Sequence, residues 1–236
     1  MKNLKRNLTL GVLFFLPVMF LLFLYPSTHN YTPLEIVKSS VSDIEKFDAF
    51  EDETILLKER ITVLVFLGSQ PMDYTIAALN LKELVYDKFK GFKNFQVVSI
   101  SQNGTQNQID NLKDEISSYE ELKHWHFVYG TESDILQFHK SLRSKKQLDS
   151  NLSSPLVYII DKDLNQRGRI DDREKKEIAN NIPEYSLVDY NCLEVSEIKN
   201  KMSEDLRILF TEYRQKRKGN FDSSIRRAED LNTNNE

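Results

Sequence analysis

Few side chains in this sequence could carry chemistry. The only cysteine is Cys192, and two of the four histidines, His124 and His126, are two residues apart. One thiol closes no intramolecular disulfide and makes no structural zinc site by itself, so a small buried hydrophobe is the favoured interpretation of Cys192. Residues two apart on a β-strand point to the same face, so the histidines could share a metal ion. Two imidazoles make a weak site, and the competing interpretation is that they flank an aromatic strand.

Other catalytic or ligand-binding patterns are weak. Met72 offers a soft thioether donor of the type that copper(I) favours, but the sequence gives no geometry that joins it to the histidines. Acidic residues such as Asp110, Asp114 and Glu115 show no paired-carboxylate pattern and are expected on a solvated helix face. With 7 glycines in the chain, no phosphate-binding loop stands out, and neither does a Ser-His-Asp arrangement. We therefore expect a protein that is not an enzyme and holds no cofactor.

The composition indicates one folded domain with no nucleic-acid footprint. Hydrophobic residues make up 40% of the 236 residues, including 14 Phe and 10 Tyr, which is enough apolar material for a core. Basic residues number 32 against 36 acidic ones, so the formal net charge is −4. This balance argues against nucleic acid as a partner.

An apolar segment near the N-terminus predicts a membrane anchor. Residues 8–25 (LTLGVLFFLPVMFLLFLY) carry no charge and reach the roughly 17 to 25 residues that a bilayer-spanning helix needs. Pro17 can be accommodated in such a helix. The alternative is a cleaved signal peptide, but no Ala-x-Ala pattern and no lipid-accepting cysteine follow the segment. We expect a retained anchor that makes the lipid bilayer a partner.

Charges on the two sides of this segment predict its orientation. The basic residues before it are Lys2, Lys5 and Arg6. No charged residue follows until Glu35, so the positive-inside rule places residues 1–7 in the cytoplasm and the rest of the chain outside. Residues 26–41 are expected to be a linker, and in a bacterium the domain after it would lie in the periplasm.

Alternating strand and helix patterns over residues 42–218 predict a single α/β domain. The clearest strand is ITVLVFL at residues 61–67, a continuous apolar run typical of a central strand covered on both faces. The other expected strands cover residues 95–100, 125–129, 155–161 and 169–171. Residues 47–57 suggest a small hairpin, and residues 219–236 a polar, flexible tail.

Helices are expected between the strands and after them. One helix with a regular apolar stripe covers residues 74–90, with Asp73 available as its cap, and another helix opens at Thr131. The stripe of the last helix consists of Val195, Ile198, Met202, Leu206, Leu209, Phe210 and Tyr213. This helix ends in the basic residues Arg214, Lys216, Arg217 and Lys218. Cations suit the helix dipole there, and contact with anionic lipid is the alternative.

Three segments of the sequence resemble, in order, the motifs of one known family. They are VFLGSQPMDYTIAAL (residues 65–79), WHFVYGTESDI (125–135) and PLVYIIDKDLNQRGRI (155–170). They are similar to the active-site segment, a Trp-containing segment and the late hairpin of the Sco/SenC family, membrane-anchored copper chaperones for cytochrome oxidase. The resemblance covers residues 44–215. It implies a thioredoxin-like fold of the peroxiredoxin-related branch, a central mixed sheet flanked by helices.

The chain departs from the family at the residues that do its chemistry. Gln70 stands where the first cysteine of the family's pair is expected, and neither Tyr74 nor its neighbours supplies the second. The family's copper-binding histidine precedes the late strand, where residues 151–154 read NLSS. Thiol exchange needs a thiolate at this turn, so a thiol oxidoreductase is disfavoured.

The sequence therefore predicts a non-catalytic binding module with a degenerate active site. The binding residues are expected in the turn and on the edge that faces it: Gln70, Pro71, Met72, Tyr74, Ser154 and Pro155. A cis bond at Pro155 is one hypothesis, because thioredoxin-like folds often carry one before this strand. The partner expected is a membrane or envelope protein, and the resemblance implies a role in respiratory oxidase assembly. The alternative is a metal carrier that uses His124, His126 and Met72.

Overall fold

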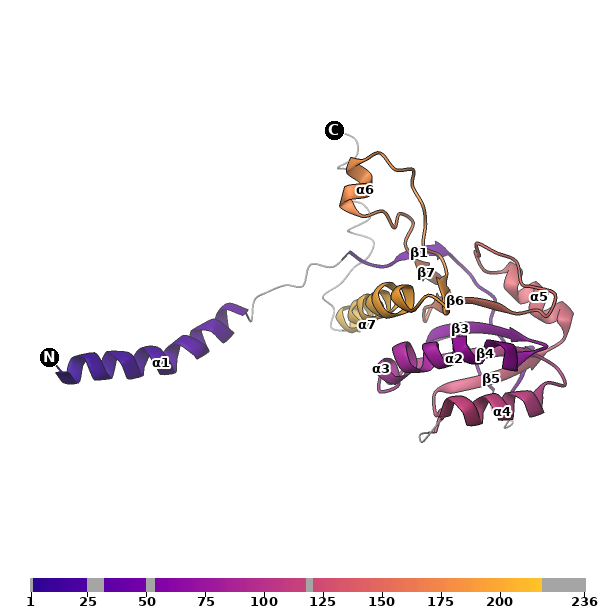
Figure 1. Ribbon diagram of the computed structural model, residues 1–236, viewed down its shortest axis with the longest axis horizontal. Coiled ribbons are helices and arrows are strands. Elements are labelled where there is room, and N and C mark those ends of the chain that lie inside the picture. Colours follow the sequence, from indigo (N-terminus) through magenta and orange to yellow (C-terminus); the bar gives the residue numbers. More distant parts are fainter. Residues whose placement is uncertain (1, 25–31, 50–53, 118–120, 218–236) are drawn as a thin grey trace. The chain divides into compact units, whose positions relative to one another are not determined.

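The computed structural model describes residues 2–24, 32–49, 54–117 and 121–217 (Figure 1). The chain forms two compact units, Met1–Thr32 and Pro33–Glu236, and each is described by itself. The predicted flexible tail, residues 219–236, lies outside the described residues.

The first unit contains one helix, α1 (Lys2–Leu24), with Pro17 inside it. Its large apolar side chains between Leu10 and Phe20 are 45% to 73% exposed, so they form no buried core. Within the described part of the chain, no helix combines the length and the apolar content that crossing a membrane requires. The predicted membrane segment, residues 8–25, overlaps α1 and runs past its end by one residue that lies outside the described ranges.

The second unit is built around a mixed sheet of eight strands (Figure 1). The three parallel strands are β3 (Ile61–Gly68), β4 (Phe95–Gln102) and β5 (Trp125–Gly130). The antiparallel strands are β6 (Ser154–Ile160), β7 (Gln166–Gly168), β8 (Tyr190–Asn191), β1 (Glu35–Lys38) and β2 (Asp48–Ala49). Their order is β1-β7-β6-β3-β4-β5-β2, and β8 also pairs with β6. The predicted α/β class is thereby confirmed.

Two apolar cores cover the two faces of the sheet, which explains why β3 is apolar throughout. Its residues Ile61, Val63, Val65 and Leu67 join one core, whereas Leu64 and Phe66 join the other, as the two-residue period of a strand requires. The helices α2 (Thr75–Leu81), α4 (Gln106–Ser117) and α7 (Ser203–Arg217) bury apolar residues in the first core. Helix α5 (Glu132–Lys140) packs in the second core.

Helix ends and registers differ in places from the sequence prediction. Two π-helical turns, Lys82–Tyr86 before α3 (Asp87–Phe89) and Glu197–Met202 before α7, interrupt the predicted helices. Val195 was predicted on the buried stripe of the last helix, but it is 48% exposed, because the wider turn rotates the residues before it around the helix axis. Asp73 does not cap α2, since Tyr74 occupies the N-cap without a side-chain hydrogen bond.

The edges of the sheet also differ from the prediction. Strand β1 lies inside the predicted linker 26–41 and pairs with β7, with Leu34 and Val37 buried, so the sheet begins before the predicted boundary at residue 42. Strand β2, within the segment 47–57 predicted as a hairpin, pairs with β5, and residues 50–53 of that segment lie outside the described residues. The strand predicted at 169–171 is β7, which ends at Gly168, and α6 (Lys175–Ala179) follows it. Short edge strands carry too few apolar residues to be recognised by periodicity.

Candidate functional site

The end of β3 is fastened to the loop that precedes β6. Gly68 has a φ of +63°, and a Cβ atom at this position would lie 1.9 Å from the carbonyl oxygen of Asn151. Only glycine allows the two backbones to approach this closely. The next residue, Ser69, donates its backbone N–H to the same Asn151 carbonyl at 2.8 Å. The turn that resembles an active-site segment therefore has a fixed position against residues 149–153.

The carboxylate of Asp149 organises that loop. Its Oδ1 accepts hydrogen bonds from the backbone N–H groups of Asn151 and Ser153 and from the Ser153 hydroxyl, each at 2.9 Å. Tyr74, on the turn side, donates its hydroxyl to Asp149 Oδ2 at 3.0 Å. Burial alone would raise the pKa of Asp149, but the hydrogen bonds from Ser153, Tyr74 and Asn151 outweigh it and lower the pKa. Burial raises the pKa of Tyr74, so the phenol stays protonated and donates.

The turn places its predicted binding residues in different environments. Gln70 is exposed and its carbonyl accepts from the Asp73 N–H at 3.1 Å, which closes a short 3₁₀ turn over Pro71–Tyr74. Pro71 is buried beneath the turn. Met72 is 36% exposed, so Gln70 and Met72 are the predicted binding residues of the turn that are exposed to a partner, and the charged Asp73 between Met72 and Tyr74 is exposed as well.

The edge that faces the turn was predicted at Ser154 and Pro155, but the contacts with the turn begin earlier in the chain, at Asp149. Ser154 is buried and pairs with Phe66 in the sheet, so it is a structural residue. The described residues contain no cis peptide bond, so the hypothesis of a cis bond at Pro155 is wrong. Pro155 continues the extended strand β6, and its carbonyl accepts from the Cys192 N–H at 2.9 Å. Asp149 and Asn151 bond to the turn, and the sequence analysis did not predict them as site residues. The run Asp149-Ser150-Asn151 is a turn signal that could have located them.

Comparison with known proteins identifies the fold. No protein-family model matches the sequence, and no curated protein matches it. The structure of a putative protein disulfide isomerase from Bacteroides thetaiotaomicron is similar with a TM-score of 0.50 and 8% identity, covering 80% of this chain and 99% of that one. The chain has a thioredoxin-like fold.

Proteins of the SCO1/SenC family, which the sequence resembles, are also among the similar structures of this thioredoxin-like domain. A SCO1/SenC family lipoprotein from Bacillus anthracis has a TM-score of 0.48 and 16% identity, covering 75% of this chain and 96% of that one. The copper-bound ScoI of Bradyrhizobium japonicum has a TM-score of 0.40 and 13% identity, covering 72% and 99%. At such identities the likeness concerns the fold and not the activity.

The lone cysteine of the thioredoxin-like domain lies near the site in space but is buried. Its backbone N–H donates to the Pro155 carbonyl, and its own carbonyl accepts from the Asn80 side chain, each at 2.9 Å. The Cys192 side chain belongs to the first core and is 2% exposed. Burial, followed by the charge of Glu197, strongly raises the pKa of the thiol. The interpretation of Cys192 as a buried hydrophobe is confirmed, and a thiolate is disfavoured there.

An apolar rim of exposed side chains borders the turn, and we define it as Met72, Ile76, Leu193 and Val195. Ile76 is 68% exposed, Leu193 53% and Val195 48%. Ile76 lies one helical turn before Asn80, and the bond from Asn80 to the Cys192 carbonyl brings this face of α2 beside the chain at Leu193. Four exposed apolar side chains around one turn are the kind of surface that a protein partner covers.

The histidines and Met72 lie at opposite ends of the sheet. His124 immediately precedes β5, and its carbonyl accepts from the N–H of Val97 near the start of β4. Met72 follows the far end of β3, which runs parallel to β4 and β5. Strands of this length extend about 25 Å, so no ion can bind both ends. In the described ranges there is no group of three or more His, Cys, Asp or Glu side chains that could hold a metal ion.

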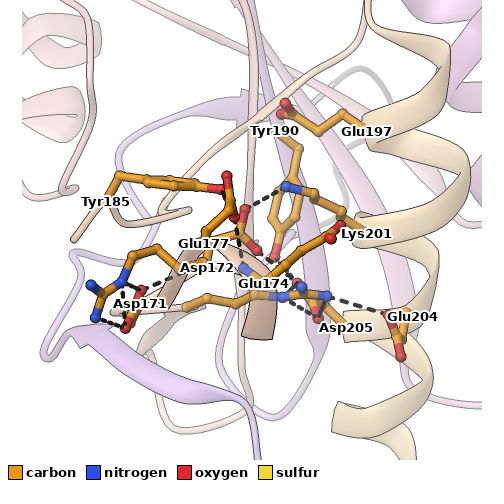
Figure 2. A network of polar contacts seen from close by, with 12 residues as sticks. Asp171, Asp172, Glu174, Glu177, Tyr185, Tyr190, Glu197, Lys201, Glu204 and Asp205 are labelled. Atoms are coloured by element: carbon orange, nitrogen blue, oxygen red, sulfur yellow. Dashed lines mark hydrogen bonds and ion pairs between the residues drawn. The ribbon is translucent and has the colours of Figure 1, made fainter. Parts of the chain in front are cut away.

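A second polar cluster lies between the chain after β7 and helix α7 (Figure 2). The Arg169 guanidinium donates to Asp205 at 2.7 and 3.0 Å and to Asp172 at 3.0 Å. Asp205 also accepts from the Tyr190 hydroxyl at 2.6 Å, and Lys201 pairs with Asp172. Burial and then the charge of Asp205 raise the pKa of Tyr190. Two cations face the two buried carboxylates, and Arg169 also pairs with the exposed Glu204 at 3.4 Å, so the cluster holds elements together and has no excess positive charge for an anionic ligand.

Proposed function

We propose that this protein is a non-catalytic thioredoxin-like module that binds a protein partner through the turn end of its sheet. The turn end comprises residues 68–76 and 149–155 together with the apolar rim. The observation that carries the proposal is the fixed geometry of this end, where Ser69 bonds to Asn151 and Tyr74 bonds to Asp149. A rigid surface loses little conformational entropy on binding, so it favours association even without a reactive group.

The composition of the turn end supports a protein as the ligand. The turn end combines the exposed apolar side chains of the rim with the exposed polar Gln70, and protein interfaces combine apolar contacts with polar groups that fix orientation. The only thiol of the chain is buried in the core, so electron transfer through a dithiol is not available to it. The proposed activity is therefore docking.

The proposal includes anchoring of the domain by the N-terminal segment. The exposed apolar side chains of α1 and the uncharged residues 8–25 support insertion into a bilayer, with residues 1–7 in the cytoplasm. The partner is then a membrane or envelope protein on the outer side, and the family resemblance suggests a component of respiratory oxidase assembly. Resistance of the protein to carbonate extraction, and digestion of its domain by protease added to spheroplasts, would support this arrangement. Release by carbonate would contradict it.

Site-specific crosslinking of the full chain in its native membrane tests the docking surface. A photo-crosslinking amino acid at Met72 should capture one defined partner, and the same group at Ile178 on α6 is the control, because Ile178 is also apolar and 49% exposed. In the chain that carries the crosslinking amino acid at position 72, the paired substitutions Gln70→Arg and Ile76→Arg should abolish the crosslink. The substitution Ile178→Arg in the same chain should leave it unchanged. Equal crosslinking from both positions, or a crosslink that survives the paired substitutions, would refute docking at the turn end.

A further inference from the structure

A basic cavity lies on the thioredoxin-like domain at the C-terminal end of α7. Its volume is about 540 Å³, and among the described residues that line it five are basic and none is acidic. The basic residues are Lys93, Lys162, Arg214, Lys216 and Arg217. Lys93 comes from the loop before β4 and Lys162 from the loop after β6, so three separate parts of the chain bring their charges together.

The helix dipole does not account for this cluster. Cations in the last turn of a helix are favourable, which would explain Arg214 and Arg217 by themselves. Lys93 and Lys162 do not belong to α7, and placing them beside its basic end costs repulsion among like charges. Burial first, and then the charge of Arg217, lower the pKa of Lys162, against the opposing effect of Asp163 and Glu59. Lys162 therefore lies close enough to Arg217 for their like charges to repel.

Neighbouring carboxylates satisfy only part of the positive charge. Lys216 pairs with Glu212 at 3.0 Å, and Glu212 also binds the buried Arg167. Among the residues that the structure describes, no carboxylate pairs with Lys93, Arg214 or Arg217. These cations remain available to an anion, and arginine binds phosphate oxygens through paired N–H donors.

Aromatic rings form the rest of the wall. The rings of Phe92 and Phe210 lie 4.3 Å apart between centroids, and both side chains are only partly buried. The Tyr213 ring lies 5.1 Å from the amino groups of both Lys162 and Lys216. A ligand that combined an anionic group with an apolar body would contact the cations and these rings together.

We propose that this cavity binds a phosphate group carried on an apolar body. An anionic phospholipid and a soluble phosphate ester both have this chemistry. The site is separate from the turn end, so it goes beyond the docking function proposed above, and either proposal can fail without the other.

Binding can be measured on the full chain in neutral detergent micelles by phosphorus NMR. The probes are dihexanoyl phosphatidylglycerol, dihexanoyl phosphatidylcholine and inorganic phosphate. The test variant is Lys93→Glu with Arg214→Glu, two exposed positions whose replacement leaves the core intact. The matched control is Lys38→Glu with Lys140→Glu, which makes the same change of charge on β1 and α5, at exposed positions outside the cavity lining.

We expect the anionic lipid to bind the native chain and the control equally, and the test variant at least about ten-fold more weakly. Binding of phosphatidylglycerol without inorganic phosphate would identify a lipid as the ligand. Comparable binding of inorganic phosphate would show that the apolar body contributes nothing, and it would overturn the proposed class of ligand. The proposal is overturned if neither anion binds more tightly than phosphatidylcholine, or if the test variant and the control lose binding equally.

Discussion

Tyr74 and Asp149 are 75 residues apart in the sequence and share a hydrogen bond of 3.0 Å that joins the degenerate turn to the loop facing it. Removing the hydroxyl in Tyr74→Phe should cost about 1 kcal/mol or less of unfolding free energy, because the pair is partly solvated. Its larger effect should be faster amide exchange at Asn151 and Ser153, whose N–H groups bind the same carboxylate. Hydrogen exchange of native and variant chains checks this, and unchanged exchange at both residues would contradict it.

The pH dependence of stability follows from Asp149. Its pKa in the folded chain lies below the ordinary value of 3.8, so the folded state binds the proton less readily than the unfolded state. The stabilisation is then fully present above the unfolded pKa and is lost as the pH falls through the folded pKa. Denaturant unfolding at pH 6 and near pH 3 should show a smaller acid-induced loss in Asp149→Asn than in the native chain. An equal loss in both would contradict the role of this carboxylate.

Gly68 should tolerate no side chain. Gly68→Ala forces a left-handed alanine and a clash with the Asn151 carbonyl, and should cost about 3 kcal/mol or more of unfolding free energy. Gly104→Ala is the matched control, because Gly104 has a φ of +92° but no atom within 4 Å of the added Cβ. It should cost only about 1 to 2 kcal/mol. Chemical denaturation measures both, and equal losses would indicate that the close approach to Asn151 is relaxed in solution.

The Arg169 cluster should stabilise the packing of the chain after β7 against α7. Arg169→Met leaves Asp205 buried with only the Tyr190 hydroxyl and should cost about 3 to 5 kcal/mol of unfolding free energy. Arg173→Met removes a similar guanidinium that binds the more exposed Asp171 and Glu184, and should have a much smaller effect. Thermal unfolding compares the two variants. A smaller loss for Arg169→Met than for Arg173→Met would refute the structural role of the cluster.

Cys192 should be inert in the folded chain. Its thiol is buried with a strongly raised pKa, so a maleimide at pH 8 should label it only after the chain unfolds. The labelling rate in increasing urea should therefore follow the unfolding transition seen by circular dichroism. Rapid labelling of the native chain would show an accessible thiol and reopen the question of thiol chemistry.

The secondary structure of the domain could be predicted because most of its signals are local. The apolar run at 61–67 is a strand buried on both faces, and Thr131 caps α5 by accepting from the Asp134 N–H as its residue type suggested. The edge strand β1 was missed, and β2 was expected in a local hairpin although it pairs with β5, because backbone pairing with a neighbour forms these strands and their side chains carry little pattern. The π turns were also missed, because they are adjustments of helices to their packing and have no local sequence pattern.

The sequence by itself determined the lack of a cysteine pair, the apolar N-terminal segment and the alternation of strands and helices, because composition and periodicity are properties of the chain alone. Tertiary structure decided the site. It placed Asp149 and Asn151 against the turn and separated His124 from Met72 by the length of parallel strands. It also gathered the cations of three segments around one cavity. Contacts between residues far apart in sequence depend on strand order and loop path, which no local pattern encodes.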